Sequence, residues 1–302
     1  MNRLIAAASV SVALAVCCVR AEQTRPPQPA GPVVLFVLSG SADAFDVVPV
    51  AVIDKGKFTE PISGSSDERD IAKFANTHYT TGRALRVLSG GAAVGTATVT
   101  GDGRSTECGK TAGHVTLKST FTPTGSLMAL ATTSETMGKG ERARRAPTTE
   151  ERGAALKAAA DAWKGLPAAA IADPDVVNLT AIDVRGDGKP LLVGSLVARQ
   201  AAARDVLFML LEPSATGFTP AFAQKERFTK DKLMEGVELS VVGSGDAIYV
   251  ERLADHVDVD GDGISEIVTK TNGFEGDKYA IYKAVGGAWK KVFEFSNYRC
   301  GF

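Results

Sequence analysis

Acidic residues recur at alternate positions in a short segment near the C-terminus. Asp258, Asp260 and Asp262 occupy positions one, three and five of this segment, Glu266 occupies position nine, and glycines occupy positions four and six. Calcium takes six to eight oxygen ligands in flexible geometry, so alternate carboxylates, a backbone carbonyl and water can complete its shell. The spacing predicts one calcium site, with these four carboxylates and the carbonyl of Ile264 as ligands.

Four carboxylates in so short a segment also repel one another. At separations of about 5 Å and an effective dielectric near 20, each pair costs about 3 kcal/mol if no cation lies between them. A folded loop is therefore expected to hold a cation. An Asp-Gly turn with solvated acids and no metal is the open alternative. An EF-hand is disfavoured because its position-twelve glutamate is replaced here by Thr269.

A related segment begins 75 residues earlier, at Asp183. It keeps acids at Asp183 and Asp187, but it has Arg185 at position three and Leu191 at position nine. Two carboxylates with an arginine between them do not need a divalent ion. We expect Arg185 to act as an internal counter-ion and this copy to lack a metal site.

The two segments resemble the FG-GAP repeats of integrin α-subunit propellers and the bacterial VCBS repeats. The signature of those repeats is an acidic Asp-Gly-rich loop that leads into a hydrophobic strand, and the resemblance covers residues 181–194 and 256–268. It implies a calcium loop at the corner of a β-propeller blade, and a role in binding or adhesion to a protein or glycan ligand. Two repeats are too few to close a propeller, so degenerate further blades and a smaller β assembly both stay open.

Motifs for catalysis are not evident. The chain has no Gly-x-Ser-x-Gly elbow, and His78, His114 and His256 are scattered without zinc-ligand spacing. The interpretation is a non-enzymatic binding or adhesion module with no catalytic residues. The alternative is a secreted or periplasmic carbohydrate-active hydrolase or lyase on a propeller-like scaffold, because that chemistry needs only two suitably placed carboxylates.

The N-terminus indicates export. Residues 1–21 combine the basic Arg3 with a short apolar stretch and small residues before Glu22, which is typical of a secretory signal peptide. A buried first element and a lipoprotein anchored through Cys17 are the open alternatives. The proline-rich residues 22–32 are typical of an extended linker. We expect a secreted, periplasmic or cell-surface protein without a transmembrane span.

The charge balance argues against a nucleic-acid partner, and the cysteine content indicates a disulfide. The 34 basic residues nearly balance the 35 acidic residues, so no basic field is available to hold nucleic acid. Outside the signal segment the chain has two cysteines, Cys108 and Cys300, which is an even number. In an exported chain such a pair favours a disulfide, with two free thiols as the alternative.

The remaining pattern predicts a mainly β fold with two short helices, built as propeller-like or partial-propeller repeats. Ser65-Ser66-Asp67-Glu68 and Thr148-Thr149-Glu150-Glu151 have the spacing of helix starts, and Ser89-Gly90-Gly91 is typical of a hairpin turn. The expected organisation comprises a β-rich region over 33–133, an exposed linker over 134–147, a helix over 148–165 and a β region with two repeats over 166–302.

Overall fold

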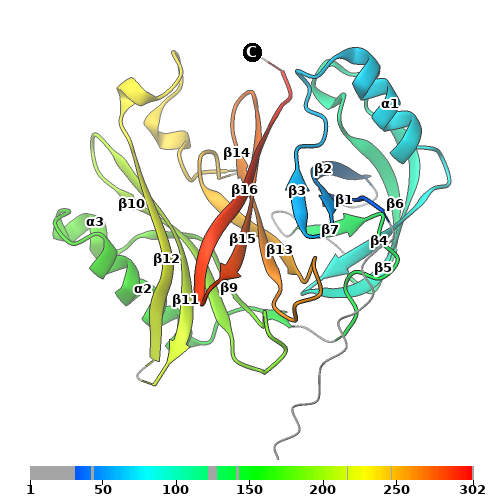
Figure 1. The fold of residues 1–302 in the computed structure, drawn as a ribbon. Coiled ribbons are helices and arrows are strands. Elements are labelled where there is room, and N and C mark those ends of the chain that lie inside the picture. Colours follow the sequence, from blue (N-terminus) through cyan, green and yellow to red (C-terminus); the bar gives the residue numbers. More distant parts are fainter. Residues whose placement is uncertain are drawn as a thin grey trace, which may run out of the picture.

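The computed structural model describes residues 31–41, 44–121, 128–140, 143–215, 217–245 and 247–300. These residues form three β-sheets and three α-helices, so the expected mainly β class is confirmed (Figure 1). Within these ranges no helix has the length and apolar character required to cross a bilayer. The predicted signal peptide over 1–21, the Cys17 anchor and the linker up to residue 30 lie outside the described residues.

Both expected helices form. Helix α1 (Glu68–His78) begins after Asp67, whose carboxylate accepts the Arg69 N–H. Helix α2 (Thr149–Ala162) begins after Thr148 with a complete capping box, in which Thr148 and Glu151 accept each other's backbone N–H. A short third helix, α3 (Ala168–Ala172), was not predicted.

The N-terminal region folds into a barrel-like sheet. Six strands close it because the first strand pairs with the last. Their order around the barrel is β1 (Val33–Ser41), β7 (Ala129–Thr132), β4 (Ala84–Ser89), β5 (Ala92–Asp102), β6 (Gly113–Ser119) and β2 (Ala44–Asp54). The short strand β3 (Lys57–Thr59) extends the sheet beyond β2.

Strand β1 is apolar at successive positions because both of its faces are buried. Val34, Phe36 and Leu38 belong to a core that includes residues of α1, while the alternate residues Leu35 and Val37 pack toward the C-terminal region. Alternate side chains of a strand point to opposite faces, so a continuous apolar run is the sequence of a doubly buried strand.

The C-terminal region contains two four-stranded antiparallel meanders, each with its strands in sequence order. The first meander comprises β9 (Asp175–Ile182), β10 (Leu191–Arg199), β11 (Arg204–Ser214) and β12 (Gly217–Phe228), and the two-residue strand β8 (Arg144–Arg145) pairs with β9. The second meander comprises β13 (Glu251–Val257), β14 (Glu266–Asn272), β15 (Gly276–Val285) and β16 (Ala288–Tyr298). In each meander, the acidic Gly-rich loop joins the first strand to the second.

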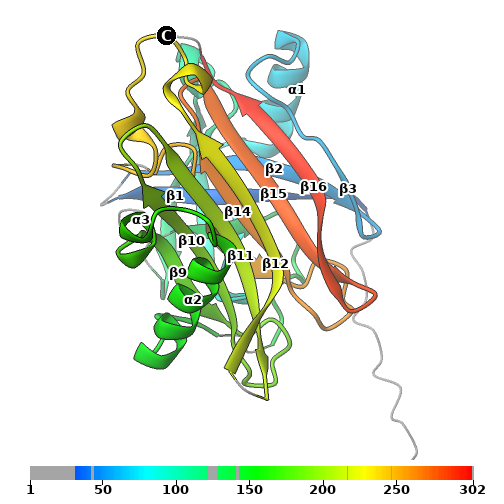
Figure 2. The ribbon, with the colours of Figure 1, turned by 90° about the vertical axis from the view of Figure 1, so that its left-hand side faces the viewer.

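The second meander lies between the first meander and the barrel (Figures 1 and 2). Helices α2 and α3 cover the opposite face of the first meander. Between the meanders, the Tyr282 ring lies 5.2 Å from the Phe208 ring and 5.0 Å from the Phe222 ring, measured between centroids. Because each acidic loop joins the first two strands of its meander, this packing of the two sheets also fixes the positions of the two loops.

The expected exposed linker over 134–147 is wrong in part. Ser134 and Met137 are buried, Met137 packs in the core between the barrel and the second meander, and Arg144 belongs to β8. The Arg144 guanidinium donates to the carbonyls of Met128 and Ala254. Polar composition suggested solvent exposure, but these side chains instead join the barrel to the second meander.

Cys108 and Cys300 form the expected disulfide, across 192 residues of sequence and with a Cα–Cα distance of 5.0 Å. Cys108 lies between β5 and β6 of the barrel, and Cys300 follows β16. Nearby, Asn297 donates to the Thr111 hydroxyl at 2.9 Å in a buried contact. The end of the second meander is therefore held to the barrel both covalently and by hydrogen bonding.

Candidate functional site

The loop between β13 and β14 is shaped by its first acid. The two carboxylate oxygens of Asp258 accept the N–H groups of Gly261 at 2.7 Å and Gly263 at 3.0 Å. Both glycines have left-handed backbones, with φ of 75° and 87°. A side chain at either position would be strained there, so the glycines allow Asp258 to close the turn on itself.

Three of the four acids that the sequence singled out lie close together. Asp258, Asp260 and Asp262 each offer a carboxylate oxygen, and these oxygens lie within 4.8 Å of one another. Asp262 also accepts the N–H of Ile264 at 2.9 Å, and the Ile264 side chain packs against the core between the meanders. The loop thus brings together three hard oxygen donors of the kind that calcium prefers.

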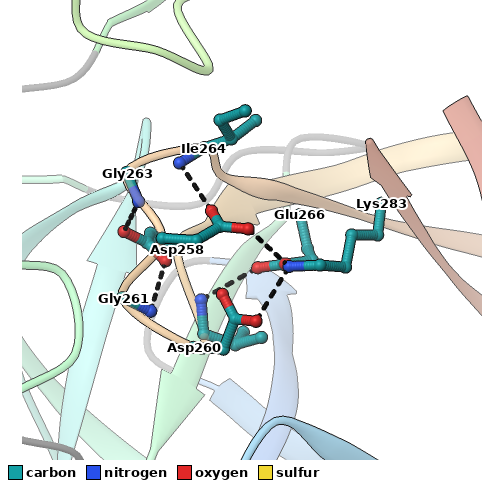
Figure 3. Close-up of polar contacts among 9 residues, drawn as sticks. Asp258, Asp260, Gly261, Gly263, Ile264, Glu266 and Lys283 are labelled. Carbon is teal, nitrogen blue, oxygen red and sulfur yellow. Dashed lines mark hydrogen bonds and ion pairs between the residues drawn. The ribbon is translucent and has the colours of Figure 1, made fainter. Parts of the chain in front are cut away.

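A lysine that was not predicted as part of the site reaches into this group (Figure 3). The Lys283 ammonium lies 2.9 Å from Asp260, 2.9 Å from Asp262 and 2.6 Å from Glu266. Partial burial lowers the pKa of Lys283, but hydrogen bonds to Asp262, Glu266 and Asp260 outweigh it and hold that pKa above its usual value. The folded loop therefore already contains one positive charge.

Glu266, the fourth predicted carboxylate, is buried and is not part of the cluster of three aspartates. Its side chain is 0% exposed, and its second carboxylate oxygen accepts the Val259 N–H at 2.9 Å. Burial raises the pKa of Glu266 to about 7, against the opposing effect of the hydrogen bond from Lys283. Buried carboxylates are costly without a partner, so Lys283 is the side chain that lets Glu266 remain charged at this position.

The loop of the first meander has the same backbone design. Asp183 accepts the N–H groups of Gly186 at 2.6 Å and Gly188 at 3.0 Å, and both glycines are left-handed, with φ of 67° and 76°. Burial raises the pKa of Asp183, but these backbone N–H groups outweigh it and hold the pKa below its usual value. Asp187 accepts the Lys189 N–H, as Asp262 accepts that of Ile264.

The prediction that Arg185 acts as an internal counter-ion of its own loop is wrong. Its guanidinium pairs with Glu212 on β11 at 3.2 Å, instead of lying between Asp183 and Asp187 as their counter-ion. Asp183 is satisfied by the backbone N–H groups of its own loop. The prediction took account only of charges within the loop, whereas the Arg185 side chain extends to the third strand of the meander.

The two loops carry the same ion pair with the charges exchanged. Arg185 and Asp260 both occupy position three of their loops. Their partners are Glu212 and Lys283. Glu212 follows Leu211, which pairs with Leu192 across the second and third strands of the first meander. Lys283 follows Tyr282, which pairs with Ile267 in the same way in the second meander. Each meander therefore uses its third strand to neutralise position three of its acidic loop.

Comparison of this chain with known protein families, with curated proteins and with solved structures finds no match.

Proposed function

We propose that this chain is an exported β-repeat protein that acts as a binding module and takes up one calcium ion in the loop over 258–266. The observation that carries the proposal is the convergence of three carboxylate oxygens within 4.8 Å on a loop closed by left-handed glycines. The disulfide supports an oxidising compartment, in keeping with export.

The donor set fits calcium in chemistry and number. Asp258, Asp260, Asp262 and Glu266 would supply carboxylate oxygens, with the Ile264 carbonyl as the further protein ligand predicted from the sequence. Bound calcium would supply positive charge that organises these oxygens. The Lys283 ammonium now lies between three of these carboxylates, so we infer that calcium and Lys283 compete for them.

The two meanders support a common origin as repeats. Each has four strands in order, an acidic loop between its first two strands and an ion pair from its third strand. We propose that they correspond to two FG-GAP-like units, packed face to face as a partial propeller, with the barrel in place of further blades. The first unit would have no metal because apolar Leu191 replaces the position-nine carboxylate.

Thermal and chemical unfolding in calcium or in chelator tests the calcium site. Calcium at one hundred times its dissociation constant should stabilise the fold by about 2.7 kcal/mol, and extracellular sites typically have dissociation constants of about 0.1 to 1 mM. Asp260→Asn should lose most of this response. Asp187→Asn, an acid-to-amide change in the first loop at the position equivalent to Asp262, should keep it.

Equal stability of the wild-type protein in millimolar calcium and in chelator would contradict the calcium proposal. A titration that finds a second site, lost in Asp187→Asn, would contradict the assignment of a single site to the second meander.

A further inference from the structure

The layer between the two meanders changes character along its strands. At one end it is filled by aromatic side chains, among them Phe208, Phe222 and Tyr282. Toward the other end it opens into a cavity of about 410 Å³. We call this cavity the meander cleft, and its walls include Glu226, Phe228, Tyr249, Thr271, Lys278 and Tyr298. Small-molecule sites typically occupy about 300 to 1,000 Å³, so the cleft has the size of one.

A smaller cavity continues the meander cleft toward the aromatic end. It shares Glu226, Tyr249, Thr271 and Lys278 with the cleft and adds deeper polar groups, including Glu251 and Glu294. The Glu251 carboxylate is held in place because it accepts the Thr269 hydroxyl at 2.6 Å and the Tyr282 hydroxyl at 2.8 Å. The deep end of the cleft is therefore a fixed acceptor surface.

The backbone at Tyr249 is strained. Its φ is 62°, a left-handed conformation that costs a bulky residue about 1 to 2 kcal/mol. The conformation is held by a hydrogen bond from the Tyr249 N–H to the Asn272 carbonyl at 2.8 Å. The ring stacks on Phe228, with centroids 5.2 Å apart and planes 14° from parallel. Strain of this kind clusters at ligand sites, and here it places an aromatic ring in the wall of a cavity.

A second tyrosine lines the same cleft. Tyr298 is 41% exposed, so its ring is accessible to a ligand in the cleft. Its backbone is fixed because its carbonyl accepts the Gly64 N–H, from the segment between β3 and α1, at 2.9 Å. The cleft thus offers two tyrosines on firmly held backbone.

Charge limits the class of ligand. The two connected cavities are lined by five carboxylates and two ammonium groups: Glu226, Glu251, Glu275, Asp277, Glu294, Lys278 and Lys291. Glu294 already pairs with both lysines, at 2.7 Å and 3.7 Å. Asp277 is paired with Lys270 and Arg299 outside the lining. The remaining carboxylates repel anions and favour ligands that donate hydrogen bonds.

We propose that the meander cleft binds a neutral sugar, with a ring face against Tyr249 or Tyr298 and hydroxyl groups donating to Glu226 and Glu251. A sugar combines an apolar ring face with many hydroxyl donors, which are the two features that the lining complements. This assignment rests on the proposed binding role and names its ligand class, but it does not depend on calcium in the 258–266 loop.

Calorimetric titration with cellobiose, maltose and N,N′-diacetylchitobiose tests the assignment, with glucose 6-phosphate as the anionic comparison. At least one neutral disaccharide should bind saturably, and the phosphorylated sugar should not. Tyr298→Ala or Tyr249→Gly, whichever removes the ring that contacts the sugar, should weaken binding about fivefold, because one aromatic contact contributes about 1 kcal/mol. Glycine suits the left-handed backbone at position 249, so that variant removes the ring without adding strain.

Val285→Ala is the matched control, since Val285 is 40% exposed at the end of β15 and is absent from the cleft lining. It should bind as the wild type does. If the neutral disaccharides do not bind, or if glucose 6-phosphate binds in preference to them, the sugar assignment is overturned. If a disaccharide binds both tyrosine variants as tightly as it binds the wild type, the cleft assignment fails while the broader binding role stands. Calcium titration of the same samples reports separately on the 258–266 loop.

Discussion

The Lys283 ammonium lies 2.9 Å from the Asp260 carboxylate, at the centre of the acidic loop of the second meander. In the first meander the equivalent positions hold Glu212 and Arg185, so the pair persists with its charges exchanged. Crowded carboxylates in the second loop are therefore partly neutralised by the protein itself. Calcium is not required to relieve all of their repulsion, and a calcium ion that bound to Asp260 and Glu266 would have to displace or shift the lysine.

The Arg185 and Glu212 pair should contribute little to stability. Their side chains are 40% and 30% exposed, and exposed pairs typically couple by about 0.2 to 1 kcal/mol. A double-mutant cycle with Arg185→Gln and Glu212→Gln, measured by urea unfolding, should return a coupling in that range. Glutamine at 212 keeps an acceptor for the Trp289 indole N–H. A coupling above about 2 kcal/mol would show that solvent does not screen the pair.

Asp255 should make stability fall as pH rises. Its buried carboxylate accepts the Gly90 N–H at 2.9 Å, and burial raises its pKa from 3.8 to about 6, although nearby Arg144 opposes the shift. A carboxyl group whose pKa is higher in the folded state stabilises the folded protein at pH values below its unfolded-state pKa. This stabilisation is lost as the pH rises through the folded-state pKa. The loss should be about 3 kcal/mol between about pH 4 and pH 6.5.

Asp255→Asn isolates this effect, because asparagine can still accept the Gly90 N–H but does not titrate. The difference in unfolding free energy, wild type minus variant, should decrease across the same pH range. His78 acts in the opposite direction, since burial lowers its pKa to about 4, so only this difference is informative. A constant or increasing difference would contradict the assignment.

The Cys108–Cys300 disulfide should stabilise the fold substantially. It closes a loop with a sequence separation of 192 residues, for which the chain-entropy argument gives about 5 kcal/mol. Denaturant unfolding with and without a reducing agent measures the effect. A Cys108→Ser, Cys300→Ser variant should match the reduced protein and should not respond to reductant. Equal unfolding midpoints for the oxidised and reduced wild type would contradict the prediction.

The capping box of α2 should be worth about 1 kcal/mol. Thr148→Ala removes the hydroxyl that accepts the Glu151 N–H at 3.2 Å, and loss of an N-cap typically costs about that much. Thr149→Ala, one position inside the helix, is the matched control and should have little effect. Urea unfolding compares the two variants, and equal destabilisation would indicate that the cap is not specific.

Local patterns predicted the elements that depend on local interactions. The capping spacing at Thr148 and the glycine pair at Gly90 and Gly91 each correspond to the expected helix start or hairpin turn. The two turn glycines have φ of 61° and 78°, as a two-residue hairpin requires. The alternating acids of the 258–266 loop also converge, because glycines at fixed positions allow that turn.

Interactions across strands could not be predicted in the same way. Barrel closure depends on the pairing of β1 with β7 and of β2 with β6, strands that lie far apart in the sequence, and the partners of Asp260 and Arg185 depend on strand register. A one-residue change in register turns every side chain to the other face, so loop spacing alone cannot locate Lys283. A hairpin alignment that pairs Ile267 with Tyr282 would have placed Lys283 beside Glu266.

Lys283→Met tests the competition between lysine and calcium most directly. The variant keeps the aliphatic length of the side chain but leaves buried Glu266 without its ammonium partner. In chelator near neutral pH, it should be less stable than the wild type by about 1 to 3 kcal/mol, because Glu266 loses its partner but, with a pKa already raised to about 7, can take up a proton. Lys290→Met, a change at an exposed lysine of β16, is the control.

The decisive measurement is the calcium dissociation constant of Lys283→Met, determined by calorimetry beside the wild type and Lys290→Met. Removal of the competing ammonium should tighten calcium binding by at least about tenfold, which corresponds to about 1.4 kcal/mol, and calcium should restore the stability lost in chelator. A dissociation constant equal to that of the wild type, or no calcium binding by the variant, would contradict the account.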